Sequence, residues 1–133
     1  MKRYLLDSHT VIWAMTDPDK LSNQVLKILQ DSEQLFVSAV SFWEIAIKDG
    51  KGKLQLNNFR LQDIPDYCRR LGIQQISLTP DQAITYSNLP FSEDLKDPFD
   101  RMLVHQSIKG NYTLISRDSK MKIYEKDGLN CVW

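Results

Sequence analysis

Four acidic side chains stand where short apolar runs end or where predicted helices begin. Asp7 closes the first apolar run of the chain, and Asp118 comes two residues after the fourth. Glu44 and Asp100 each fall in the first turn of a predicted helix. Carboxylates brought close together repel one another, and a divalent cation is the usual relief, since Mg²⁺ and Mn²⁺ prefer carboxylate and water oxygens. A metal held in this way serves phosphoryl chemistry, because it activates water and neutralises charge that develops on the phosphate.

These acids also have structural interpretations that the sequence leaves open. Ser41 and Glu44 have the spacing of a capping box, in which the serine hydroxyl caps a helix and the glutamate reaches back. Asp97 before Pro98 fits an N-cap, and capping is the role that we favour there. Asp100 also fits the first turn of a helix, where a carboxylate interacts favourably with the helix dipole, and Asp118 also fits a turn. A carboxylate that ends an apolar strand is solvated or functional, so Asp7 is the hardest to explain structurally.

The elements that must position these acids alternate between short strands and longer helices. Short apolar runs predict strands at residues 4–6, 35–37, 73–78, 112–116 and 129–133. Helical spacing and end signals predict helices at residues 8–15, 21–30, 41–48, 61–71, 97–108 and 119–126, and one that begins with a capping box at 79–82. This alternation predicts a single α/β domain over residues 1–133, with a mostly parallel central sheet flanked by helices in three α/β/α layers. Ligands of such sheets bind beyond the carboxyl ends of the strands, so we expect the four acids in one cleft there.

Composition excludes several classes of protein. With 133 residues, 42% hydrophobic and 26% charged, the chain suits one globular domain. The longest apolar run, residues 11–15, is far below the roughly 20 residues that cross a bilayer, and Asp7 interrupts any signal-peptide pattern. We therefore expect a cytoplasmic protein with no membrane association. Cys68 and Cys131 lack the spacing of a zinc ribbon or disulfide framework.

The formal net charge is zero, from 17 Lys and Arg against 17 Asp and Glu. At face value this argues against a strongly basic nucleic-acid binder. Setting aside the four clustered acids leaves 17 basic against 13 acidic side chains, a net charge of +4. The zero is thus partly an average over an acidic pocket and a mildly basic remainder, and it does not count against a nucleic-acid partner.

Four segments carry a resemblance to a known family. They are Leu5–His9 with Trp13, Ser38–Lys48, Asp97–Leu103 and Leu114–Asp118. Together, in this order and spacing, they resemble a PIN domain over essentially the whole chain, and in particular the VapC-type ribonuclease toxins of bacterial and archaeal toxin–antitoxin pairs. The S-x-x-S-x-W-E-I-A-I-K and D-P-F-D-R patterns are the specific ones.

The resemblance implies a metal-dependent endoribonuclease. Asp7, Glu44, Asp100 and Asp118 fall on the acidic catalytic and metal-binding quartet of the family, and Asp97 is a nearby fifth acid that can also meet the metal. One or two Mg²⁺ or Mn²⁺ ions are implied, with water attacking the phosphodiester in line. The implied products carry a 5′-phosphate and a 3′-hydroxyl.

Other residues are candidates for supporting the acids or contacting RNA. Ser116 and Ser8 stand where the family often has small hydroxyl residues that can orient a ligand or water. Arg101, Arg117 and Lys48 adjoin the acids or lie one turn away, where cations can meet RNA phosphates. Of these, Arg101 is favoured because it recurs in the family segment. A solvated charge or a local ion pair is the alternative for each, and for Lys48 it is the favoured one.

The aromatic residues near the acids are expected to serve mainly in packing. Trp43 is expected in the core, with base stacking as the less favoured alternative. Trp13 is assigned to helix packing. His9, two residues after Asp7, can reach phosphate or simply pack, and the sequence does not decide between the two.

The favoured interpretation is a toxin ribonuclease, paired with an antitoxin that occludes the cleft and assembled as a homodimer. A housekeeping PIN nuclease without an antitoxin, and a non-catalytic RNA- or protein-binding PIN module, are the alternatives. The intact quartet speaks against a binding module, which has no need of four converging acids. A haloacid-type phosphatase is disfavoured, since it needs a second aspartate where this chain has His9.

Overall fold

Five parallel strands form the central sheet of the computed structural model, which describes residues 1–133. They are β1 (Tyr4–Leu6), β2 (Leu35–Ser38), β3 (Ile73–Ile76), β4 (Thr113–Ile115) and β5 (Asn130–Val132), in the order β3-β2-β1-β4-β5. The central strand β1 pairs on both sides, so that Leu6 is opposite Val37 of β2 and Ile115 of β4. All three of these side chains are fully buried, as expected of parallel strands that are covered on both faces.

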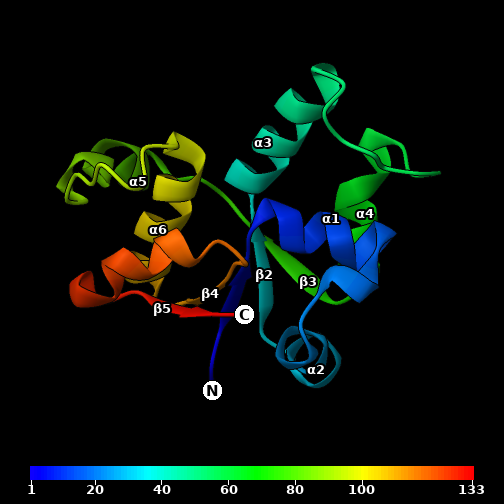
Figure 1. Cartoon of the computed structure of the whole chain (residues 1–133), viewed down its shortest axis with the longest axis horizontal. Coiled ribbons are helices and arrows are strands. Elements are labelled where there is room, and N and C mark those ends of the chain that lie inside the picture. The colour runs from blue at the N-terminus through cyan, green and yellow to red at the C-terminus, as the bar shows by residue number, and fades with distance from the viewer.

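Helices cover both faces of this sheet (Figure 1). The α-helices are α1 (Ser8–Thr16), α2 (Asn23–Asp31), α3 (Ala39–Gly50), α4 (Ile64–Arg70), α5 (Pro80–Thr85) and α6 (Pro98–Gly110). The 3₁₀ helices are η1 (Pro18–Lys20), η2 (Leu61–Asp63), η3 (Tyr86–Asn88) and η4 (Ser119–Asp127). No helix combines the length and the apolar content needed to cross a membrane.

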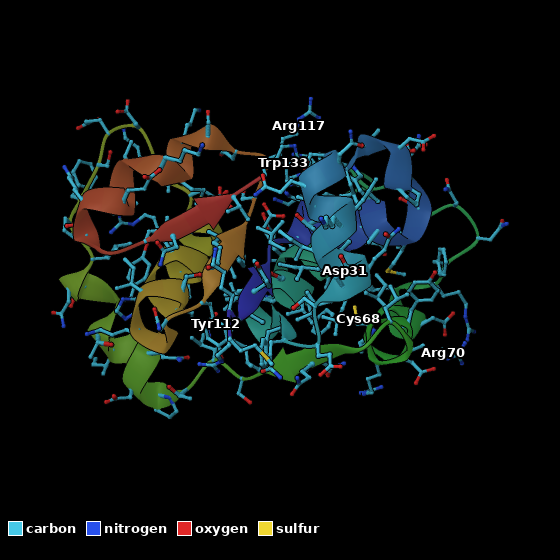
Figure 2. All side chains as sticks on the ribbon, turned by 90° about the horizontal axis from the view of Figure 1, so that it is seen from below. Asp31, Cys68, Arg70, Tyr112, Arg117 and Trp133 are labelled. Carbon is cyan, nitrogen blue, oxygen red and sulfur yellow. The ribbon has the colours of Figure 1, made fainter.

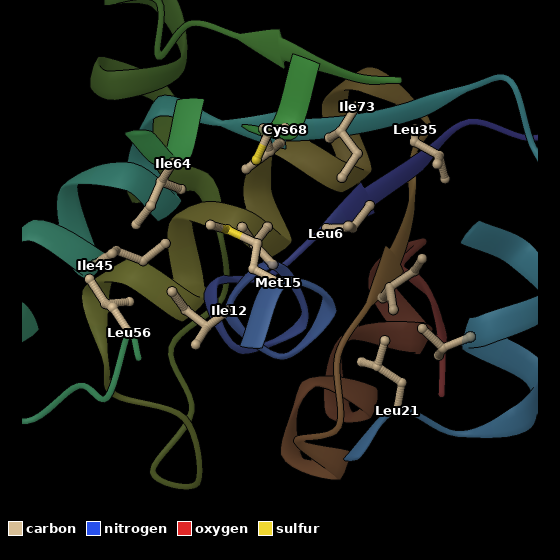
Figure 3. Packing of buried hydrophobic residues seen from close by; sticks show 14 residues of the cluster. Leu6, Ile12, Met15, Leu21, Leu35, Ile45, Leu56, Ile64, Cys68 and Ile73 are labelled. Atoms are coloured by element: carbon tan, nitrogen blue, oxygen red, sulfur yellow. The ribbon is translucent and has the colours of Figure 1, made fainter. Parts of the chain in front are cut away.

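Two hydrophobic cores lie on opposite faces of the sheet, because successive strand residues point to opposite sides. Leu6 belongs to a core shared with α1, α2 and α4, and Figure 3 shows it among side chains that include Met15 of α1 and Ile73 of β3. Its neighbour Leu5 belongs to the second core, shared with α6 and η4. The predicted three-layer α/β/α arrangement is confirmed, and the sheet is entirely parallel.

Several local predictions differ from the structure. The helix predicted at 119–126 is a 3₁₀ helix, and the one predicted at 61–71 divides into η2 and α4, with Pro65 in the first turn of α4. The capping box at Thr79 and Gln82 is confirmed at the start of α5. The capping box that the sequence left open for Ser41 and Glu44 does not form, because α3 begins earlier and Ser38 is its N-cap.

Candidate active site

Asp7 lies at the junction of the central strand β1 and α1, where it is the N-cap of the helix. Its Oδ1 accepts hydrogen bonds from the Thr10 backbone N–H at 2.9 Å and from the Thr10 hydroxyl at 2.7 Å. The side chain is almost fully buried. Burial raises the pKa of Asp7, while hydrogen bonds from Ser116 and Thr10 act in the opposite direction. The fold therefore holds a carboxylate with a fixed orientation at the carboxyl end of the sheet.

Glu44 points from α3 toward the start of α1. The Ser8 hydroxyl donates a hydrogen bond to Glu44 Oε1, and Lys48 Nζ lies 3.0 Å from Oε2. Because Ser38 accepts the capping hydrogen bond of α3 from Val40 N–H, Glu44 is not used as a cap and its carboxylate is available to the cleft.

Asp97 and Asp100 share the first turn of α6. Asp97 is the N-cap, as expected, and its Oδ1 accepts from the backbone N–H groups of Phe99 at 2.8 Å and of Asp100 at 3.2 Å. Burial raises the pKa of Asp100 to about 7, and the charges of Asp97, Glu44, Asp7 and Asp118 add to the effect. The negative charges of the other four acids therefore act directly on the Asp100 carboxyl group.

Asp118 closes the cluster from the segment that follows β4. It is the N-cap of η4, where its Oδ1 accepts from the Lys120 N–H at 3.0 Å. Its own backbone N–H donates to the hydroxyl of buried Ser116 at 3.1 Å. Ser116 therefore interacts with both Asp7 and Asp118, and it ties the segment after β4 to the end of β1.

A cleft of about 380 Å³ brings these acids together. Its lining consists of Asp7, Glu44, Asp97, Asp100 and Asp118 together with His9, Trp13, Lys48 and Arg117. Nine residues from four separate segments of the chain thus meet in one place. Two larger hollows lie elsewhere, around residues 1–4, and neither contains such a group of carboxylates.

The donor set of the cleft fits a hard divalent cation. Glu44, Asp97 and Asp100 each offer a carboxylate oxygen, and these atoms lie within 4.8 Å of one another. Oxygen donors of this kind are the ligands of Mg²⁺ and Mn²⁺. A cation among them would also remove the like-charge repulsion that contributes to the raised pKa of Asp100.

Arg101 does not lie where we expected it. The side chain is 8% exposed, and its Nε donates to the Tyr86 hydroxyl at 2.8 Å. The two terminal nitrogens donate to Tyr124 Oη and to the carbonyls of Pro90 and Leu89. Arg101 does not line the cleft, so the prediction that it contacts RNA is wrong; it ties the segment before α6 to η4.

One of the aromatic predictions also needs correction. Trp43 is 60% exposed instead of lying in the core, and its ring packs edge-on against Phe99 at 5.1 Å between centroids. Trp13 packs against the hydrophobic core, as expected, but it is only half-buried and also lines the cleft together with His9. Arg117 and Lys48, both predicted near RNA, line the cleft as well. The role of Trp13 was missed because helix periodicity does not distinguish a half-buried indole from a core one.

Comparison with known proteins gives relatives over the full length of the chain. Ribonuclease VapC22 from Mycobacterium tuberculosis is 29% identical over 136 residues, with all of both chains covered. Similar solved structures include VapBC2 from Rickettsia felis bound to a DNA fragment from its promoter, with a TM-score of 0.64, 16% identity and coverage of 97% of this chain and 96% of that one. DNA-bound VapBC from Salmonella typhimurium has a TM-score of 0.64 at 14% identity, covering 99% and 98%.

A third structure, FitAB bound to an IR36 DNA fragment, has a TM-score of 0.63 at 16% identity and covers 97% of this chain and 93% of that one. At such identities these structural similarities establish the fold alone. The sequence comparison is more specific, since residues 4–127 match the family described as PIN domain. That range includes every acid of the cleft and all but the last strand of the sheet. The chain therefore belongs to the PIN domain family.

Proposed function

We propose that this protein is a metal-dependent endoribonuclease that hydrolyses RNA phosphodiester bonds, and that it is the toxin of a type II toxin–antitoxin pair. The observation that carries the proposal is the convergence of five carboxylates from four separate segments in one cleft. Three of them offer oxygens within 4.8 Å of one another. The full-length similarity to a protein named Ribonuclease VapC22 supports RNA as the substrate.

The roles of the acids follow from their surroundings. Asp7, Glu44, Asp100 and Asp118 are proposed as the catalytic and metal-binding quartet, with Asp97 as a further oxygen donor beside its capping role. One or two Mg²⁺ or Mn²⁺ ions, when bound, would lower the pKa of water and neutralise charge on the phosphate. The chain itself contributes fixed orientation, through hydrogen bonds to the carboxylates of Asp7, Glu44, Asp97 and Asp118.

Serine hydroxyls support this arrangement. Ser8 donates to Glu44, and Ser116 interacts with Asp7 and Asp118, so each hydroxyl holds an acid of the quartet from behind. These bonds link α1 to α3 and β1 to the segment after β4. We therefore propose Ser8 and Ser116 as positioning residues.

The charge of the cleft explains why a cation is needed before RNA can enter. Five carboxylates face only two permanent cations, Lys48 and Arg117, so a phosphate is repelled by the metal-free cleft. Lys48 is paired with Glu44, which leaves Arg117 as the exposed cation of the rim. Arg117 is accordingly proposed as the principal phosphate contact and Lys48 as a secondary one.

An antitoxin is proposed as the protein partner. The similar solved structures are VapBC and FitAB assemblies bound to DNA, and their similarity to this chain extends over at least 97% of its length. The homodimer expected from the sequence stays a prediction.

Cleavage of a single-stranded RNA oligonucleotide tests the proposal. Purified protein should cut the RNA with Mg²⁺ or Mn²⁺ and not in excess chelator. Asp7→Asn should abolish cleavage while leaving the far-ultraviolet circular dichroism unchanged, whereas Asp94→Asn, at an exposed loop aspartate outside the cleft, should cleave normally. Full activity of Asp7→Asn, or in chelator, would refute the metal mechanism. RNA binding without any cleavage would favour the non-catalytic module.

The pairing with an antitoxin has its own test. Co-expression with the neighbouring reading frame should yield a stable complex in which cleavage is blocked. Cleavage by the chain with no neighbouring partner that binds it would indicate a housekeeping nuclease instead.

A further inference from the structure

One wall of the cleft is aromatic, although the rest of its lining is charged. His9 and Trp13 are one turn apart on α1, so their side chains share a face of the helix. Their ring centroids are 5.4 Å apart, with the planes tilted by 43°. His9 is exposed and Trp13 half-exposed, and both line the cleft that holds the carboxylates.

Core packing accounts for only part of the Trp13 side chain, and it does not account for His9, which is exposed. The residues of α1 that reach the core beneath the helix are Val11, Ile12 and Met15, all buried. His9 is exposed, whereas Trp13 is half-buried: part of its side chain packs against this core and the rest is accessible. An accessible aromatic pair in an otherwise polar cleft presents ring faces to whatever enters.

The indole is held in place by its neighbours. Trp133 packs edge-on against Trp13, with ring centroids 6.0 Å apart and an interplanar angle of 67°. The Arg117 guanidinium carbon lies 5.6 Å from the Trp13 centroid, and Lys20 Nζ lies 5.7 Å from it. Figure 2 shows Arg117 and Trp133 at the same edge of the molecule. A ring fixed in this way loses little conformational freedom when a ligand stacks against it.

The position of Arg117 adds a phosphate contact to this wall. It precedes Asp118 directly, and it lines the cleft together with the aromatic pair and the carboxylates. Its guanidinium also contacts the Trp13 ring, as a cation does when it shares a stacking surface. Proteins hold single-stranded nucleic acid by stacking a base on an aromatic ring while an arginine contacts a phosphate.

We propose that His9, Trp13 and Arg117 form a nucleotide subsite, in which an unpaired base next to the scissile phosphate stacks on the His9–Trp13 pair while Arg117 contacts the adjoining phosphate. The inference rests on the proposed RNA cleavage, and it defines the substrate class as RNA that is unpaired at the cleavage position. Stacking uses the face of the base, so the subsite selects for an unpaired nucleotide more than for a particular base.

A coupling experiment tests the stacking contact. Once the cleavage position in an oligoribonucleotide is mapped, matched substrates are made that lack the base on either the 5′ or the 3′ side of the scissile phosphate. Trp13→Leu should lower kcat/KM on the complete RNA about tenfold, mainly through KM. One of the two abasic substrates should reduce wild-type kcat/KM by a similar factor and leave Trp13→Leu unaffected. Trp13→Phe, which keeps a stacking ring, should retain most of the kcat/KM that Trp13→Leu loses.

Two controls separate stacking from a structural role. Phe91→Leu removes an exposed ring outside the cleft and should behave as wild type on every substrate. His9→Ala, which changes an exposed side chain with little risk to the core, should show the same coupling to the same abasic position as Trp13→Leu. If both abasic substrates lower kcat/KM equally in wild type, Trp13→Leu and His9→Ala, no base stacks there and the proposal is overturned.

Binding distinguishes failure of this subsite from failure of the proposed function. Fluorescence anisotropy of the same labelled RNAs, with Ca²⁺ replacing Mg²⁺, should show the same coupling in Kd between Trp13 and one base. If the wild type cleaves no RNA yet binds it with this coupling, the nuclease proposal fails and the subsite stands. Cleavage of RNA without coupling in either assay leaves the nuclease proposal in place and refutes the subsite.

Discussion

At the scale of single residues, the cost of gathering carboxylates is concentrated on Asp100. Its pKa of about 7 reflects burial first and the other four acids second. A folded-state pKa above the unfolded value means that the folded protein takes up a proton. The contribution of Asp100 to stability is therefore full below the unfolded pKa of 3.8 and is lost as pH rises from there through about 7, where Asp100 ionises inside the cluster.

Asp100→Asn should reverse this loss. Because asparagine cannot ionise, the variant should unfold in chelator at a higher temperature than wild type at pH 8, by a margin on the order of a few kcal/mol in unfolding free energy. The margin should shrink at pH 5, where wild-type Asp100 is mostly protonated. Mg²⁺ at pH 8 should raise the Tm of wild type more than that of the variant. A lower Tm of Asp100→Asn at both pH values would contradict this account.

The structural role of Arg101 could not be predicted from the sequence. Its burial depends on the hydroxyls of Tyr86 and Tyr124 and on two carbonyls, none of which is identifiable as a partner before the chain folds. Arg101→Lys keeps the charge but cannot reproduce the planar fork, so it should lower the unfolding free energy by about 2 kcal/mol or more in urea titrations. Unchanged stability with weakened RNA binding would instead restore Arg101 as an RNA contact.

At the scale of elements, Ser38 and Ser41 were both candidates for the N-cap of α3, and tertiary contacts decided between them. Ser38 accepts from Val40 N–H and donates to Gln106 Oε1 at 2.6 Å, whereas the Ser41 hydroxyl is buried without a hydrogen-bond partner. Gln106 is 68 residues away in sequence, so its influence was not predictable from local spacing. The start of α3 matters because it sets the position of Glu44.

This difference gives a matched pair of variants. Ser38→Ala should lower the unfolding free energy by about 1–2 kcal/mol, since it removes the cap and leaves Gln106 without one partner. Ser41→Ala should be neutral or slightly stabilising, because it removes a buried hydroxyl that has no partner. Urea unfolding of the two variants measures this contrast, and equal losses would restore Ser41 as a cap.

At the scale of the whole molecule, the alternation of strands and helices was sufficient to predict the parallel three-layer fold. It also predicted the end of the sheet at which the acids meet, because the carboxyl ends of parallel strands share one edge. The sequence could not tell which neighbours of the acids face the cleft. Arg101 and Arg117 each adjoin an acid, yet one is buried among tyrosines and the other lines the rim.

The zero net charge also reflects how the charges are distributed over the folded molecule. The zero total combines a cleft of five carboxylates with a surplus of basic side chains elsewhere, six against three acidic over residues 101–133. Neutralising the cleft with a divalent cation would therefore leave a surface that attracts RNA. Affinity for RNA should accordingly rise when Ca²⁺ or Mg²⁺ is added, as measured by anisotropy at fixed ionic strength, and an affinity that is independent of the cation would contradict this interpretation.

The chemistry of the product ends tests the central claim most directly. If the carboxylate cleft directs water to the phosphodiester with the help of Mg²⁺ or Mn²⁺, mass spectrometry of the cleaved oligonucleotide should show a 5′-phosphate and a 3′-hydroxyl, and no products in chelator. A 2′,3′-cyclic phosphate, formed equally well in chelator, would mean that the RNA's own 2′-hydroxyl attacks and that the cleft does not perform the proposed reaction.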